Sequence, residues 1–135
     1  MDLIIDANII ISALIPPKSE IYNLIFFKDI KLYAPEFLSD EINKYKEEIL
    51  EKSELSKDEF YLFLALIISR INFVSFKEFK ELIQKAKEIS YDPKDIEYLA
   101  LALKFKCAIW SNDKDFKKQS VIKIFSTSEL LKELI

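Results

Sequence analysis

Four acidic side chains that lie far apart along this sequence could act together on one ligand. Asp6 directly follows a short apolar run, and Asp113 follows another after a gap of two residues. Glu41 and Asp95 each lie near the start of a segment with helical periodicity. Gathered carboxylates repel one another, and their oxygen ligands suit a hard divalent cation such as Mg²⁺ or Mn²⁺. Such an ion can orient a phosphodiester and lower the pKa of an attacking water.

The residue types that are missing narrow the chemistry further. The sequence has no glycine, which excludes a P-loop, a dinucleotide-binding fingerprint and a glycine-flanked nucleophile elbow. It has no histidine, which excludes a Ser-His-Asp triad, a paired-histidine zinc helix and a histidine general base. The single cysteine, Cys107, is too little for a thiolate metal site and suits a reducing compartment. Any chemistry therefore falls to carboxylates and lysines.

The length and composition predict one domain over residues 1–135. Half of the residues are apolar, enough for a sizeable core, and the net charge is −3. The longest apolar stretch, residues 60–71, includes Ser69 and Arg70 and is too short to span a membrane. No secretory signal is recognisable, so we expect a soluble, cytoplasmic protein without membrane association. High lysine and glutamate content with one methionine and one cysteine hints at a thermophile.

Short apolar runs alternate with helical patterns, which favours an α/β fold with a parallel sheet covered on both faces. We expect strands at 3–5, 31–34, 72–75, 108–110 and 121–125. We expect helices at 8–14 (ended by Pro16-Pro17), 19–27 (with Ser19 as N-cap), 35–50 (with Pro35 in the first turn), 56–68 (with a capping box), 76–89, 92–103 and 126 onward. Ligands bind beyond the carboxyl ends of such strands, where the following helices also begin, so the four acids can converge there.

Each acid also has a structural explanation. Asp6 could end a strand or cap the next helix, and Glu41 lies among other acids on a charged helix. Asp95 could complement its helix dipole, and Asp113 lies among turn-forming residues. Asp92, directly before a proline, is best explained as a helix N-cap. The functional hypothesis therefore depends on the joint placement of the four acids.

At this point the sequence resembles a known family, the PIN-domain nucleases. Residues 4–8 (Ile-Ile-Asp-Ala-Asn) resemble the family's opening motif, and residues 35–41 resemble its second, with Glu41 as the acid. Residues 92–102 are similar to the third motif, whose acid corresponds to Asp95. Residues 111–116 (Ser-Asn-Asp-Lys-Asp-Phe) look like the fourth. The resemblance covers almost the whole chain, with the motifs in the right order.

The resemblance implies a three-layer α/β/α sandwich around a mainly parallel sheet. It implies a Mg²⁺- or Mn²⁺-dependent endoribonuclease that cleaves single-stranded RNA, with the four acids as metal ligands and catalytic residues. Asn8 and Ser111 would then position the acids or the metal. Many relatives are VapC-like toxins that pair with an antitoxin protein and are commonly homodimeric. Ala7 departs from the family, because a hydroxyl residue often stands there.

The resemblance suggests a role for the run of lysines around Asp113. Six lysines and two acids lie between positions 104 and 123, a pattern that is usually a solvated surface. Beside a nuclease site they could offset the repulsion between acids and a phosphate chain, and Lys114, Lys117 and Lys118 are the expected substrate contacts. The run lacks arginine, so bidentate phosphate clamping is not available there. Trp110 could offer a stacking face, although a tryptophan that ends a core strand is more often packing.

Two other functions stay open at this point. The protein could keep the fold but work by binding RNA or a protein partner. The apolar circumference of residues 60–71 motivates this alternative, although core burial also explains it. A phosphate-accepting regulatory domain, with an aspartate at a strand end, is the third hypothesis.

Overall fold

The computed structural model describes residues 1–15 and 19–134, so the helix stop predicted at Pro16-Pro17 lies outside the described residues. The described chain contains a five-stranded sheet in which every pair of neighbouring strands is parallel, in the order β3-β2-β1-β4-β5. The strands are β1 (Asp2–Ile5), β2 (Lys31–Pro35), β3 (Ile71–Val74), β4 (Ala108–Trp110) and β5 (Ile124–Phe125).

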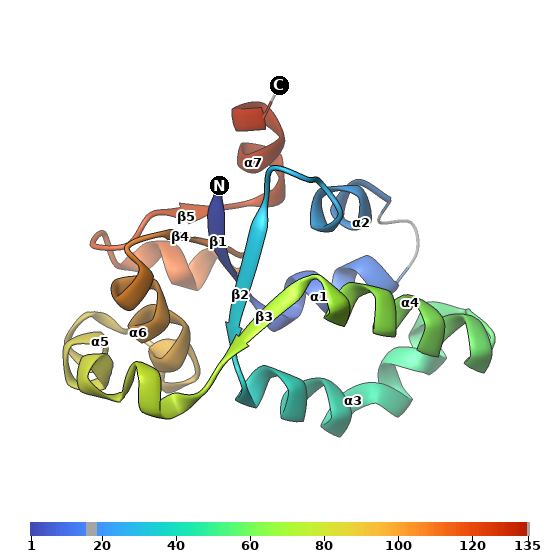
Figure 1. Ribbon diagram of the computed structural model, residues 1–135, viewed down its shortest axis with the longest axis horizontal. Coiled ribbons are helices and arrows are strands. Elements are labelled where there is room, and N and C mark those ends of the chain that lie inside the picture. The colour runs from blue at the N-terminus through green and yellow to red at the C-terminus, as the bar shows by residue number, and fades with distance from the viewer. Residues whose placement is uncertain (16–18, 135) are drawn as a thin grey trace.

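Helices cover both faces of this sheet. On one side lie α1 (Ala7–Leu14), α2 (Ser19–Ile25), α3 (Phe37–Ser53) and α4 (Lys57–Ser69), to the right of the strands in Figure 1. On the other side lie α5 (Ile83–Ile89) and α6 (Ile96–Phe105), to the left in Figure 1. The chain ends with α7 (Thr127–Leu134), which contacts β5. The expected three-layer α/β/α sandwich with a parallel sheet is confirmed.

The core explains why the strands are short and continuously apolar. Leu3, Ile4 and Ile5 of β1 are all fully buried, because β1 is the central strand and helices cover it from both sides. On α6, residues 98–102 are all buried, because the helix packs between the sheet strands β1, β2 and β4 and the helix α5. Each fully buried leucine or isoleucine stabilises the fold by roughly 1.5–3 kcal/mol. The end of β1, where Asp6 follows, is thus held by the best-packed part of the molecule.

Side-chain caps fix where several helices begin. Ser56 and Glu59 form the expected capping box at α4, and Ser126 with Glu129 makes the same pair of bonds at α7. Asp92 accepts a 3.0 Å hydrogen bond from the amide of Lys94, as expected of an N-cap. No helix in residues 1–15 and 19–134 is long and apolar enough to cross a membrane.

The expectation that Pro35 opens a helix is wrong. Pro35 is the last residue of β2, paired with Val74 of β3, and α3 begins only at Phe37. Proline has no amide hydrogen to donate, but the next amide, that of Glu36, donates to the carbonyl of Val74 and continues the ladder. The fixed φ of proline is compatible with either structure, so the sequence alone did not decide between them.

Two further elements differ from expectation. The segment expected as one helix over 76–89 is two turns of 3-10 helix, Phe76–Glu78 and Lys80–Leu82, followed by α5. The break at Phe79 changes the helical phase, so Phe76 is 51% exposed instead of facing inward. The strand expected from Val121 is confined to β5, because the Gln119 side chain bonds the backbone of Val121 and Ile122 in place of a neighbouring strand.

Candidate active site

A polar pocket of about 440 Å³ lies at the carboxyl edge of the sheet. Its wall comes from the ends of β1 and β4, the first half of α3, the 3-10 turn Pro93–Asp95 and the start of α6. All four acids singled out from the sequence line it, together with Asn8. The full lining comprises Asp6, Ala7, Asn8, Glu41, Lys44, Tyr45, Asp92, Lys94, Asp95, Tyr98, Asp113 and Phe116. Side chains from four distant parts of the sequence therefore meet at one place.

Ser111 ties the first acid to the fourth. Its hydroxyl donates a 2.7 Å hydrogen bond to the carboxylate of Asp6 and accepts a 3.0 Å hydrogen bond from the amide of Asp113. The backbone makes a parallel connection, because the amide of Asp6 donates to the carbonyl of Trp110 at 3.1 Å. Ser111 is 1% exposed and cannot exchange these partners for bulk water. It fixes the orientation of Asp6, and it holds the start of the segment that carries Asp113.

The pKa values of these acids show that burial and like charge act on them together. Burial raises the pKa of Asp6, and the nearby charge of Asp113 adds to the rise, while the Ser111 hydroxyl and the amides of Asn8 and Ala7 oppose it. The pKa of Asp95 rises to about 7, mainly through burial, with further contributions from Asp92, Asp6 and Asp113. An isolated helical aspartate that only complemented a dipole would have its pKa lowered instead.

Glu41 reaches the pocket from the side of α3. Burial is the main cause of its raised pKa, the charge of Asp6 adds to it, and Lys94 and Lys44 oppose it. Asp40, one residue earlier, is exposed and does not line the pocket. Among the clustered acids of this helix, the structure therefore distinguishes Glu41 by its position.

Lysines and tyrosines of the pocket wall were missed by the sequence analysis. Lys44 and Tyr45 lie three and four residues after Glu41, one helical turn along the same face of α3. Lys94 precedes Asp95, and Tyr98 lies three residues after it on the same face of α6. Helical spacing from each predicted acid would have found all of them except Lys94. The run of lysines at the other end of the sequence drew attention away from these positions.

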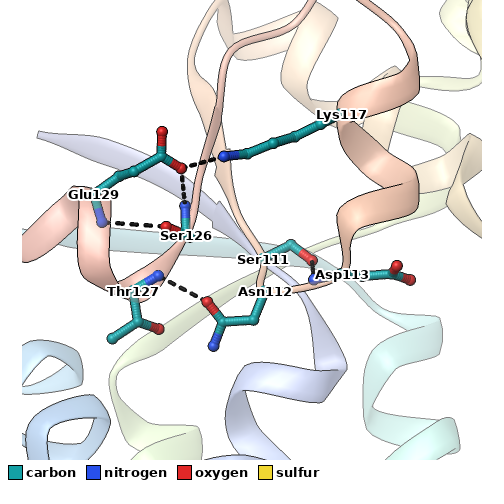
Figure 2. Close-up of polar contacts among 7 residues, drawn as sticks. All are labelled: Ser111, Asn112, Asp113, Lys117, Ser126, Thr127 and Glu129. Atoms are coloured by element: carbon teal, nitrogen blue, oxygen red, sulfur yellow. Dashed lines mark hydrogen bonds and ion pairs between the residues drawn. The ribbon is translucent and has the colours of Figure 1, made fainter.

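The three lysines expected to contact the substrate are not part of the pocket wall. Lys114, Lys117 and Lys118 are exposed and do not line the pocket. Lys117 forms an ion pair with Glu129, and its ammonium group points toward α7 and away from Asp113 (Figure 2). Lys118 pairs with Asp115 at 3.2 Å. Two lysines of the run are thus paired with acids outside the pocket, and the run does not form one continuous basic surface beside the four acids.

Trp110 and Arg70 have structural roles. Trp110 is fully buried, and its indole donates to the hydroxyl of Thr127 at 3.1 Å, so its ring packs in the core and is not a stacking platform. The single arginine, Arg70, donates to the backbone carbonyls of Ile25, Phe27 and Ile30. Cations near the acids are therefore lysines.

The donor chemistry of the pocket fits a hard divalent cation. Its acids offer only oxygen ligands, and their raised pKa values show that a positive charge among them would be favourable. In residues 1–15 and 19–134, no three His, Cys, Asp or Glu side chains are already grouped so that they could hold a metal ion. The acids share one pocket without forming a finished coordination shell.

Comparison with known proteins agrees with this geometry. Residues 4–134 match the PIN domain family. The chain belongs to the PIN-domain family. Its members are nucleases, which generally use divalent metal ions. The match includes all four acids, the end of β1 and the other four strands.

A solved structure shares the fold of this PIN domain at low sequence identity. It is the crystal structure of VapBC2 from Rickettsia felis bound to a DNA fragment from their promoter. The similarity has a TM-score of 0.67 at 16% identity and covers 93% of this chain and 98% of the other. No curated protein matches this sequence.

Proposed function

We propose that this PIN-domain protein is a Mg²⁺- or Mn²⁺-dependent endoribonuclease that cleaves phosphodiester bonds of single-stranded RNA. The observation that carries the proposal is the meeting of Asp6, Glu41, Asp95 and Asp113 along one pocket, where burial or mutual repulsion raises the pKa of three of them. Carboxylates are costly to gather and bury unless a cation offsets their charge.

Each acid has a proposed role. Asp6 and Asp113, whose relative placement Ser111 sets, would anchor the ion. Glu41 and Asp95 would complete its shell or activate a water. Asn8 would help to position the acids or the ion. A divalent ion bound here would polarise the scissile phosphate and lower the pKa of water.

The RNA backbone would be drawn to the pocket by lysines. Lys44 and Lys94 line it from opposite elements, α3 and the turn before α6, and both lie close enough to Glu41 to lower its pKa. Lys114, directly after Asp113, is a further candidate contact. Lys117 and Lys118 would contribute less, because Glu129 and Asp115 already offset their charge. Tyr45, 46% exposed at the wall, offers a ring on which an unpaired base can stack.

A cleavage assay with two neighbouring aspartates tests this function. Purified protein is incubated with labelled single-stranded RNA in Mg²⁺, in Mn²⁺ and in EDTA. Asp113→Asn removes a pocket carboxylate and should lower the cleavage rate by at least about 100-fold, above the range seen when second-shell partners of a metal site are removed. The matched control is Asp115→Asn, two residues away, whose exposed carboxylate pairs with Lys118 outside the pocket. It should cleave at nearly the wild-type rate.

Two results would contradict the assignment. Cleavage that continues unchanged in EDTA would remove the divalent ion from the reaction. Equal loss in Asp113→Asn and Asp115→Asn would show that the effect does not come from the pocket.

We also propose that the protein is a toxin of a toxin–antitoxin pair and forms homodimers. The similar VapBC2 structure supports the first proposal.

The surface of α4 supports a protein contact, because Leu62 and Leu66 are 57% and 40% exposed while Phe60, Leu64 and Ile67 of the same helix are buried. A second copy of this chain is the proposed occupant. Leu62→Lys should shift the molecular mass measured by light scattering from dimer to monomer, and a wild-type monomer would contradict the proposal.

A binding module without catalysis is the alternative, and the same exposed strip on α4 favours it. RNA binding that is indifferent to divalent ions, together with no cleavage of any RNA tested, would support this alternative. The family assignment favours a nuclease over a phosphate-accepting regulatory domain.

A further inference from the structure

The hydroxyl of Tyr98 is buried beside the acids without a hydrogen-bond partner. Tyr98 lies on α6 and is 3% exposed. Within the described residues, its phenol oxygen is the one buried side-chain nitrogen or oxygen for which no partner is found. Buried polar groups in folded proteins are nearly always satisfied, so this exception at a pocket wall calls for a partner from outside the chain, a water or a ligand.

The tyrosine ring is held in place by aromatic contacts. Phe37, at the start of α3, meets it edge to face with 5.4 Å between ring centroids. Phe116, which also lines the pocket, meets it at 6.2 Å in a similar geometry. Edge-to-face contacts at these distances are favourable and directional. The two rings therefore limit the directions in which the hydroxyl can point.

The surroundings of the hydroxyl keep its hydrogen on the oxygen. Burial raises the pKa of the phenol strongly, and the charges of Asp6 and Glu41 raise it further. The amide of Ala7 lies near the oxygen and opposes this rise, but it does not complete a hydrogen bond. At neutral pH Tyr98 is therefore a hydrogen-bond donor that has no acceptor.

We propose that Tyr98 is a positioning residue of the site, whose hydroxyl donates a hydrogen bond to an oxygen of the ligand that enters the acidic pocket. The acceptor is a phosphate oxygen of the RNA or a water that accompanies the divalent ion. Both are oxygen acceptors of similar size, and both would approach the carboxylates that surround the hydroxyl. The inference rests on the proposed function and adds a buried neutral donor to a site whose other proposed ligand contacts are mainly charged.

Tyr98→Phe tests the inference because it removes only the hydroxyl and keeps the ring between Phe37 and Phe116. The matched control is Tyr33→Phe on β2, where the ring packs on Phe105 at 4.7 Å between centroids and does not line the pocket. Three quantities are measured for each variant: the urea midpoint of metal-free protein, the Mn²⁺ affinity by calorimetry, and the affinity for labelled single-stranded RNA in EDTA by anisotropy.

A donor without an acceptor predicts that the urea midpoint of Tyr98→Phe equals or exceeds that of wild type. One of its two affinities should fall roughly 2- to 10-fold, the range of a single net hydrogen bond. A fall in Mn²⁺ affinity identifies the acceptor as water around the ion, and a fall in RNA affinity identifies it as phosphate. Tyr33→Phe should change neither affinity.

Two outcomes would overturn the inference. If the midpoint falls while both affinities stay at the wild-type value, the hydroxyl serves an internal bond of the folded protein. If all three quantities match wild type, it serves no ligand. In either case metal-dependent cleavage by the wild type would leave the proposed function standing. A wild type that binds neither Mn²⁺ nor RNA would end both proposals.

Discussion

Two polar regions of this molecule contain the same residue types, but the pKa of a carboxyl group is lowered in one and raised in the other. At the start of α7, Glu129 accepts hydrogen bonds from Lys117 and from the amide of Ser126, and its pKa falls to about 2. In the pocket, burial raises the pKa of Asp95 to about 7, and the charges of neighbouring acids add to the rise. Figure 2 shows how completely the first region is connected: Asn112 also accepts from the amide of Thr127 at 2.8 Å.

The difference teaches where to look for function in a small fold. The polar groups around Glu129 have partners within the protein, so that region needs no ligand to be stable. The pocket has acids at raised pKa and a buried tyrosine hydroxyl without a partner. Unsatisfied groups of this kind carry a free-energy cost in the ligand-free protein, which binding of a cation and a substrate can offset.

The largest effect should come from Asp6→Asn. The variant keeps the shape of a buried side chain but removes its charge, so cleavage should fall by at least about 100-fold, more than second-shell changes cause. The same change should leave the melting temperature of metal-free protein equal or higher, because an amide is less costly to bury than a carboxylate. Gel assays with Mg²⁺ or Mn²⁺ measure the cleavage rate, and calorimetry in EDTA measures the melting temperature. A large loss of stability would show that the carboxylate of Asp6 is needed for folding, as a capping group would be.

An intermediate effect should separate two pairs of lysines. Replacing Lys44 and Lys94 by alanine should weaken RNA binding on the order of 10-fold and lower the salt dependence of log Kd by roughly one per lost contact. Replacing Lys117 and Lys118 should change the affinity by less than about 2-fold, because both ammonium groups lie outside the pocket and are held by Glu129 and Asp115. Anisotropy over a range of salt concentrations gives both numbers. The reverse ranking would move the RNA path from the pocket to the lysine run.

The smallest effect should appear as two opposite pH dependences of stability in EDTA. The pKa of Asp95 is raised from 3.8 to about 7 on folding, so its contribution is present below pH 4 and is lost as the pH rises toward 7. The pKa of Glu129 is lowered from 4.5 to about 2, so its contribution is present above pH 4.5 and is lost as the pH falls toward 2. The melting temperature should therefore fall as the pH rises toward 7 through Asp95, and fall as the pH drops toward 2 through Glu129.

Variants assign the two slopes. Asp95→Asn should reduce the change of melting temperature with pH between pH 4 and 7. Glu129→Gln should reduce it between pH 4.5 and 2. An unchanged slope in Asp95→Asn would show that the carboxylate is solvated and that the pocket is less crowded with charge than the geometry indicates.

Strands and helix starts could be predicted from the sequence where the interactions that form them join residues close together in the chain. The strand before Asp6 is an uninterrupted apolar run, and Ser56 and Ser126 carry the spacing of a capping box. Pro35 was misjudged because its partner, Val74, is brought beside it only by the path of the chain. Val121 was misjudged because the side chain of Gln119, two residues earlier, bonds its amide, and this short-range contact was overlooked. The four acids were found by their positions at strand ends and helix starts and by resemblance to a family. Their roles as metal ligands stay a prediction.

The sequence by itself determined the class of chemistry, because without histidine or glycine only carboxylates, lysines and hydroxyls are left to perform it. It also determined the parallel α/β architecture, since hydrophobic periodicity is a property of consecutive residues. Only the tertiary structure decided which polar groups face the same space. It placed Lys44 and Tyr98 in the pocket and brought Lys117 into an ion pair with Glu129. Electrostatic interactions and hydrogen bonds depend on distance in space, and the order of residues does not encode that distance directly.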